Sequence, residues 1–268
     1  MHPLVNIGVS AARSAGNLIL RSTEKLDQLR IQRKGPRDFV SEVDRAAEDE
    51  IIRIIHKAYP DHAILGEESG AQGDNEVEWI IDPLDGTTNY LHGLPHYCVS
   101  IGVRERGKLT HGVVYDPYRQ DLFTASRGEG ALLNSRRIRV APRARKISEA
   151  LIGTGEPFTP GPRLDRYLPQ LQALVGHCGG IRRAGAAALD LAYVASGRLD
   201  AFWELNLKPW DIAAGIVLCR EAGAAVYGLK DSDVMKSGDI VAAHPRLLEE
   251  LRRILENEAG RTQIDAQG

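Results

Sequence analysis

The stretch "IIDPLDGTTNY", residues 80–90, carries most of the information about fold and function in this chain. Two aspartates, Asp82 and Asp85, stand three residues apart between an apolar run and a Gly-Thr-Thr sequence. The apolar run predicts a short buried strand that ends where Asp82 begins the next segment. Buried carboxylates are costly unless a positive charge compensates them. Oxygen ligands of this kind favour magnesium or manganese, and an N-cap aspartate followed by a turn aspartate is the alternative.

The residues around Asp85 also favour a phosphate site. Pro83 stiffens the turn, and Gly86 permits backbone geometry that other residues resist. A helix that begins near Thr87 or Thr88 would direct free N–H groups toward an anion. Two carboxylates and a phosphate repel one another, and divalent cations between them would remove that conflict.

Two further stretches place acidic residues at similar positions. "ILGEESG" puts Glu67 and Glu68 directly after a short predicted strand, and "LKPWDIAAG" puts Asp211 at the start of a predicted helix. Taken alone, a Glu-Glu pair is usually a solvated surface pair, and Asp211 could be a simple N-cap. All three stretches nevertheless lie where a strand gives way to a helix or loop, which is where open sheets build their sites.

The composition is that of an ordinary soluble globular protein. Of the 268 residues, 43% are hydrophobic and 26% are charged, and the net charge of −2 gives no overall basic balance for nucleic acid. The three cysteines share no metal-like spacing, which indicates small buried residues in a reducing compartment. No stretch reaches about 18 apolar residues, so we expect no membrane span and a cytoplasmic protein.

The pattern along the chain predicts a layered α+β fold in two halves. Helical spacing occurs near the N-terminus and over residues 44–58, and a period of two over residues 97–140 predicts antiparallel strands. Beyond a seam near residue 145, strands alternate with helices. We therefore expect one compact unit, with residues 1–145 carrying most metal ligands and residues 146–268 carrying Asp211 and the substrate contacts.

Together, "DPLDGTTN", "GEES" and "WDIAAG" resemble the inositol monophosphatase family, within the lithium-sensitive, magnesium-dependent phosphatases. The resemblance extends from the first helix to "DIVAAHP" and is nearest to the bacterial SuhB-like branch. It implies an αβαβα sandwich with the active site between its two halves. It also implies a homodimer and hydrolysis by direct attack of water.

The resemblance implies five metal ligands: Glu67, Asp82, the carbonyl of Leu84, Asp85 and Asp211. The first three would hold one Mg²⁺, and Asp82, Asp85 and Asp211 would hold a second, with Mn²⁺ as a possible substitute. A third, weaker ion is implied near Glu67. Lys34 matches a mobile-loop lysine near that third ion, although a plain solvated lysine is an equal alternative.

The catalytic residues implied by the resemblance are Glu67, Thr87 and Asp44. Asp44 would pair with Thr87, and the pair would help to orient the attacking water. The amides of Gly86 and Thr87 would hold the phosphate, which requires no serine, cysteine or histidine nucleophile.

Besides Gly86 and Thr87, the resemblance implies substrate contacts at four further positions: Gly185, Ala186, Glu204 and Asp211. Glu204 matches a carboxylate that binds inositol hydroxyls in the family; a surface glutamate at a strand end is the alternative. Ala186 replaces the usual serine or threonine. Loss of a buried polar contact costs about 1 to 3 kcal/mol, so we expect weaker affinity for inositol phosphates than in relatives with the hydroxyl.

Three functions follow as hypotheses. The first is magnesium-dependent hydrolysis of myo-inositol 1-phosphate. The second keeps the chemistry with another substrate, such as fructose 1,6-bisphosphate, phosphoadenosine phosphate or NADP. The third is a binding role in ribosomal RNA transcription antitermination, with transcription factors or RNA polymerase as partners, as the SuhB-like branch implies.

Overall fold

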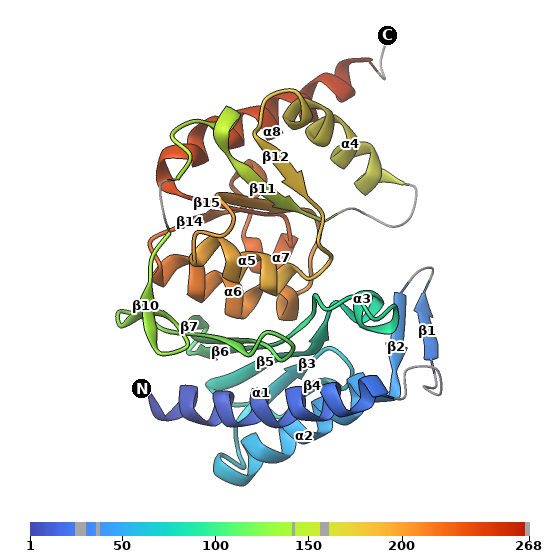
Figure 1. Cartoon of the computed structure of the whole chain (residues 1–268), viewed down its shortest axis with the longest axis vertical. Helices are drawn as coiled ribbons and strands as arrows, with labels where there is room; N and C mark the ends of the chain where they lie inside the picture. The colour runs from blue at the N-terminus through green and yellow to red at the C-terminus, as the bar shows by residue number, and fades with distance from the viewer. Residues whose placement is uncertain (25–30, 36–37, 141–142, 156–160, 266–268) are drawn as a thin grey trace.

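The computed structural model describes residues 1–24, 31–35, 38–140, 143–155 and 161–265, and for 31–35, 38–41, 231 and 257–265 it describes the backbone. Its elements stack in five layers, helix on sheet on helix on sheet on helix (Figure 1). The layered fold predicted from the sequence is confirmed.

The first layer is a pair of helices, α1 (Pro3–Ser22) and α2 (Glu42–Ala58), drawn in blue in Figure 1. Pro3 opens α1, and the ring of His2 accepts a hydrogen bond from the Leu4 amide at 3.3 Å, which caps the helix. Gly16 lets α1 lie close to the first sheet, because a Cβ there would sit 2.7 Å from the Tyr115 ring. The two helices thus cover one face of that sheet.

The second layer is an eight-stranded sheet in the order β10-β9-β8-β7-β6-β5-β3-β4. All its pairs are antiparallel except β3 with β5. The period of two over residues 97–140 predicts this antiparallel character correctly. Its strands are β3 (Ala63–Gly66), β4 (Gly70–Gln72), β5 (Val77–Asp85), β6 (Cys98–Glu105), β7 (Lys108–Asp116), β8 (Asp121–Ser126), β9 (Gly130–Leu133) and β10 (Arg136–Ile138).

The middle layer is formed by α5 (Ala187–Ala195) and α6 (Pro209–Glu221). Glycines of the first sheet admit α6: a Cβ at Gly102 would meet Ala213 at 2.7 Å, and one at Gly112 would meet the Ala214 carbonyl at 2.6 Å. This close approach places the N-terminal turn of α6 over the middle strands of the eight-stranded sheet.

The fourth and fifth layers complete the molecule. A five-stranded sheet has the order β12-β11-β13-β15-β14, and its outer face is covered by α4 (Pro162–Val175) and α8 (Pro245–Asp265) (Figure 1). β11 is parallel to β12 and β13, whereas β15 is antiparallel to β13 and β14. The strands are β11 (Leu151–Thr154), β12 (Gly180–Arg182), β13 (Ala201–Glu204), β14 (Ala225–Tyr227) and β15 (Ile240–Ala243).

Three apolar clusters fill the gaps between the layers. The first, with Ile51 and Trp79, joins α1 and α2 to the large sheet, and the second, with Leu191, joins α5 and α6 to both sheets. The third, with Trp203 and Leu251, lies under α4 and α8. Because the second cluster is shared by both sheets, the two halves pack as a continuous body. The boundary near residue 145 stays a prediction.

Smaller elements complete the fold. A hairpin of β1 (Ile31–Gly35) and β2 (Asp38–Ser41) lies beside the short helix α3 (Thr87–Leu91) (Figure 1). Two 3₁₀ turns, η2 (Ile147–Glu149) and η3 (Leu229–Asp231), and the short helix α7 (Val234–Ser237) connect the later strands. Within the described residues, no helix is both long enough and apolar enough to cross a membrane.

Candidate active site

The stretch 80–90 forms the end of β5 and the start of α3. β5 runs through Asp85, so the expectation that it ends before Asp82 is wrong. Its register against β6 shifts between these two aspartates, which is the signature of a bulge. Within the bulge, Oδ1 of Asp82 accepts a hydrogen bond from the Leu84 amide at 3.0 Å. The bulge lets backbone and side-chain oxygens gather along one short segment.

Gly86 caps α3 in a left-handed conformation, with φ of 96°. A Cβ at Gly86 would lie 2.9 Å from the His96 carbonyl and 3.3 Å from the Cβ of Ala186. The predicted helix start at Thr87 is confirmed. Gly86 is therefore required both by its backbone geometry and by the close approach of the segment that carries Ala186.

Thr87 and Asp44 meet although they belong to different elements. The Thr87 hydroxyl lies 2.8 Å from Oδ1 of Asp44 and 3.0 Å from the carbonyl oxygen of Leu84. Asp44, in the first turn of α2, is only 1% exposed. Since a hydroxyl has one proton, donation to Asp44 leaves the lone pairs of the Thr87 oxygen for another partner.

Glu67 is held in place by the backbone and by a neighbouring helix. Its amide donates to the Ile81 carbonyl at 3.1 Å, which sets it beside Asp82. The buried carboxylate of Glu48, on α2, accepts from the amides of Glu68 at 3.0 Å and Ser69 at 2.7 Å. The turn after β3 is thereby fixed from both sides.

Asp85 reaches across to the middle layer. Its Oδ2 accepts a hydrogen bond from the Ala188 amide at 2.7 Å, in the first turn of α5. No side chain of α5 itself caps that end, because the cap position is Ala186. One aspartate of the stretch 80–90 therefore caps a helix more than a hundred residues away in the sequence.

Asp211 joins the site through the first turn of α6. Ser100 lies opposite Asp82 in the β5–β6 register, and its hydroxyl donates to the Trp210 carbonyl at 3.3 Å. Oδ2 of Asp211 accepts from the Lys208 amide at 2.6 Å. This local cap fixes the Asp211 carboxylate at the helix start, as expected for an aspartate at that position.

The acidic side chains of the site shift one another's pKa values. Burial raises the pKa of Asp82 well above its usual value, with further contributions from Glu67, Asp85 and Asp211. Burial also raises the pKa of Asp85 to about 7, although the Ala188 amide opposes the shift. The pKa of Asp211 is raised by burial and then by Asp85. These carboxylates are thus close enough to repel one another strongly.

An all-oxygen donor set with this mutual repulsion fits a divalent cation, because a positive charge between the groups would remove the penalty. Glu67, Asp82, Asp85 and Asp211 supply the carboxylates, and Leu84 supplies a carbonyl. In the described part of the chain, no three His, Cys, Asp or Glu side chains converge to the spacing of metal ligands. The carboxylates are neighbours, but their oxygen atoms do not surround a common position as the ligands of a bound ion would.

Two of the expected substrate positions lie next to the metal-ligand candidates. Ala186 lies beside Gly86, as described above. Burial raises the pKa of Glu204, at the end of β13, and Asp211, Asp190 and Asp85 raise it further. Gly155 lies against the Glu204 carboxylate, leaving no room for a side chain there. Glu204 is therefore part of the same acidic neighbourhood and is not an isolated surface residue.

Gly185 is held by a residue that we did not predict. It has φ of 87°, and the side-chain amide of Asn89 on α3 donates to the Ala184 carbonyl and the His96 carbonyl, each at 2.8 Å. Asn89 therefore ties α3 to the segment that carries Gly185. Its place in the stretch 80–90 gives no sign of this role, since Ala184 is 95 residues away in the sequence.

Glu48 was also missed, but the sequence does carry a signal for it. In α2 it lies four residues after Asp44 and three before Ile51, on the face that the apolar spacing marks as buried. A carboxylate on a buried helix face must find donors.

For Lys34, the structure describes only the backbone, which lies in β1. The Lys34 side chain is not described, so its expected position near a third metal ion stays a prediction.

Comparison with known proteins identifies the family of this chain. The family model described as the inositol monophosphatase family matches residues 1–259. A Pseudomonas aeruginosa protein named Nus factor SuhB is 52% identical over 258 residues, covering 94% of this chain and 95% of that protein.

Two solved structures share the fold over nearly the whole chain. The extragenic suppressor protein suhB from Bartonella henselae has a TM-score of 0.92 and 44% identity, covering 95% of this chain and 99% of its own. An inositol monophosphatase from Anabaena (Nostoc) has a TM-score of 0.82 and 36% identity, covering 95% of each chain. The resemblance predicted from three short motifs is therefore confirmed, and this chain belongs to the inositol monophosphatase family.

Proposed function

We propose that this protein hydrolyses a small phosphate monoester, with myo-inositol 1-phosphate as the preferred substrate and two to three Mg²⁺ ions per subunit. The observation that carries the proposal is the cluster of carboxylates on β5, α6 and the turn after β3: burial raises the pKa of Asp82, Asp85 and Asp211, and Glu67 adds to each shift. Membership of the family supports phosphatase activity in general. The choice of substrate and the number of ions do not follow from family membership and are part of the proposal.

Glu67, Asp82, Asp85, Asp211 and the Leu84 carbonyl would hold the ions. Bound divalent cations supply positive charge that lowers the pKa of a water molecule and neutralises phosphate oxygens. The protein itself would orient the attacking water. The Thr87 hydroxyl donates a hydrogen bond to Asp44, so its oxygen could accept a hydrogen bond from that water and hold it in line.

The phosphate would be held at the start of α3 by the amides of Gly86 and Thr87, since the first N–H groups of a helix have no partner within it. Glu204 would accept hydrogen bonds from hydroxyl groups of the polyol, and Gly185 would leave space for the ring. Ala186 offers no hydroxyl, so one contact would be missing. Asp211 would contribute both to an ion and to the substrate.

The test is phosphate release from a panel of inositol, sugar and nucleotide monophosphates, with and without Mg²⁺. Asp85→Asn is the matched control, because asparagine keeps an oxygen that can accept from the Ala188 amide. Circular dichroism would verify that the variant is folded. Magnesium-dependent release that is fastest with myo-inositol 1-phosphate and lost in the variant supports the proposal. Faster release from fructose 1,6-bisphosphate, phosphoadenosine phosphate or NADP would reassign the substrate.

We infer a second candidate role from the name of the Pseudomonas aeruginosa relative, a Nus factor. In that role the protein would bind transcription factors or RNA polymerase, and it would do so as a homodimer. Affinity purification with wild type and Asp85→Asn, followed by mass spectrometry, separates the two roles. Capture of RNA polymerase subunits by both proteins supports a binding role that is independent of catalysis. Capture by neither removes it.

A further inference from the structure

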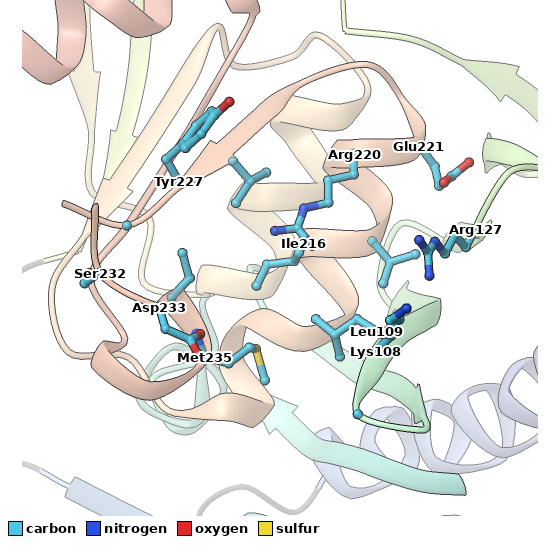
Figure 2. A pocket seen from close by; sticks show the side chains of 15 residues that line it. Lys108, Leu109, Arg127, Ile216, Arg220, Glu221, Tyr227, Ser232, Asp233 and Met235 are labelled. Carbon is cyan, nitrogen blue, oxygen red and sulfur yellow. The ribbon is translucent and has the colours of Figure 1, made fainter. Parts of the chain in front are cut away.

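A hollow of about 620 Å³ lies away from the candidate active site, between the C-terminal half of α6, the β6–β7 turn, β14 and α7 (Figure 2). From the make-up of its walls we propose that this hollow binds a small anion with an apolar ring. Binding pockets for small molecules commonly range from about 300 to 1,000 Å³. The proposal does not depend on the phosphatase assignment.

The floor of the hollow is apolar. Val217 and Ile216 come from α6, Val226 from β14 and Val234 from α7, and all four are less than 9% exposed. Leu109 and Met235 are half-buried and continue the same surface. Since the first four side chains are already nearly out of water, the apolar area that a ring would bury belongs to Leu109 and Met235, at about 25 cal/mol per Å².

The rim of the hollow carries three exposed cations: Lys108, Arg127 and Arg220. Figure 2 shows Arg220 extending from α6 over Ile216, with Arg127 and Lys108 on the same side of the hollow. In the part of the chain that the structure describes, none of the three has an ion-pair partner. They come from three separate elements and border one space.

Two carboxylates also border the hollow, but their oxygens are already engaged. Those of Glu221 accept from the amides of Gly128 at 2.9 Å and Gly130 at 2.8 Å. Asp233 caps α7 through the Met235 amide at 3.1 Å and lies 3.8 Å from the Lys236 ammonium. The acids therefore serve the fold but keep their charge, so three cations and two carboxylates leave a net charge of +1, and only the cations offer side-chain donors to an anionic group.

An apolar floor beneath a cationic rim favours a ligand that has both an apolar ring and an anionic group. A bare inorganic anion would leave the floor in contact with water, and a neutral ring would leave the cations unused. The hollow is also separate from the phosphate chemistry. Asp211 is the third residue of α6, and Arg220 lies nine residues later, about 13 Å along the helix axis at about 1.5 Å per residue.

The sequence contains a direct probe, because its only methionines are Met1 and Met235. In protein labelled with ¹³C at the methionine methyl groups, Met235 reports on the hollow. Met1, 61% exposed ahead of α1, is the internal reference. Titration with 1-naphthalenesulfonate should shift the Met235 signal in a saturable way and leave Met1 in place. Loss of one signal in Met235→Leu assigns the spectrum. An unmoved Met235 signal would overturn the proposal.

Variants separate the contributions of charge and ring. Arg127→Gln and Arg220→Gln should each weaken binding about fivefold or more, while Arg13→Gln, an exposed arginine on α1, should not change it. Neutral naphthalene-1-sulfonamide should bind about fivefold or more weakly than the sulfonate, and inorganic sulfate should not compete. Equal affinity in all three arginine variants would refute the role of the rim. Displacement by sulfate at comparable concentration would refute the role of the floor.

Discussion

The hydroxyl of Thr87 lies 2.8 Å from Oδ1 of Asp44, although 43 residues separate them in the chain. The contact joins the first turn of α2 to the first residue of α3, and it therefore crosses from the outer helical layer to the end of the large sheet. Asp44 is 1% exposed, so a buried carboxylate gains the donor that it needs. The Thr87 hydroxyl has two protein acceptors within reach, and the contact with the Asp44 carboxylate is shorter than the one with the Leu84 carbonyl.

We predict that Thr87→Val lowers kcat for phosphate release by about 10²- to 10⁴-fold, with a smaller change in KM, because valine keeps the shape and removes the hydroxyl. Thr87→Ser is the matched control and should retain most of the activity. Steady-state kinetics on the purified variants provide the measurement. Equal kcat in wild type and Thr87→Val would show that the hydroxyl does not act on the attacking water.

We predict that Mg²⁺ stabilises the wild-type protein and not Asp85→Asn. A ligand at 100 times its dissociation constant adds about 2.7 kcal/mol to the free energy of unfolding. Removal of repulsion between Asp82 and Asp85 provides the physical reason. Thermal unfolding with and without Mg²⁺ measures the effect, and Na⁺ at equal ionic strength controls for screening. The same increase in Tm for both proteins would rule out a specific site at Asp85.

The sequence predicts the long elements and the acidic motifs, and the reasons are local. A helical apolar spacing marks α1, α2 and α8, and a period of two marks the strands of the large sheet. The short strands β4, β12 and β14 have three residues each and no such pattern, so the sequence does not predict them. They exist because a neighbouring strand offers hydrogen bonds, which is information that three residues do not carry.

The candidate site also divides into residues with a local sequence signal and residues whose role depends on distant partners. Its carboxylates stand out because acidic residues after apolar strands are unusual. The residues that hold them in place do not stand out: Asn89 and Ala188 act through partners on other elements. The bulge in β5 is also invisible in the sequence, because Asp82 and Pro83 suggest a strand end, whereas pairing with β6 resumes at Asp85.

We predict that Glu48→Gln raises the Mg²⁺ concentration required for half-maximal activity by about tenfold, as changes to residues that support metal ligands commonly do. A glutamine has one acceptor oxygen and cannot serve both the Glu68 and Ser69 amides. The turn that carries Glu67 would loosen. Asp49→Asn, on the exposed face of α2, is the matched control. An unchanged Mg²⁺ requirement would mean that Glu48 only stabilises the fold.

We predict that Ala186→Ser lowers KM for myo-inositol 1-phosphate by about fivefold or more, equivalent to a hydrogen bond worth about 1 kcal/mol. The backbone of Ala186 is extended, with φ of −146°, so serine fits without strain. Ala186 is only 1% exposed and the Ala188 amide already serves Asp85, so the buried new hydroxyl would need the substrate as its partner. Ala186→Gly is the control for size alone. If KM does not change in Ala186→Ser, the missing hydroxyl does not limit affinity.

Glu50 connects α1 to α2 and gives the fold a pH dependence outside the site. It accepts from the Ser14 hydroxyl at 2.6 Å and from the Arg53 guanidinium at 2.8 Å. Chiefly Arg53, and then Ser14, lower the pKa of Glu50 to about 2. Because the folded-state pKa is lowered, the carboxylate contributes stability above its unfolded pKa of 4.5 and loses that contribution as the pH falls toward 2.

We predict that wild type is more stable than Glu50→Gln at pH 6 by about 1 kcal/mol, since the Arg53 side chain is largely exposed and solvent weakens the ion pair. Urea unfolding at pH 6, 4.5 and 3 should show that difference shrinking as the pH falls. Glu249→Gln, which removes a carboxylate from α8, controls for the change in net charge. A difference that is constant over this range would mean that Glu50 stabilises the α1–α2 contact through packing and not through its charge.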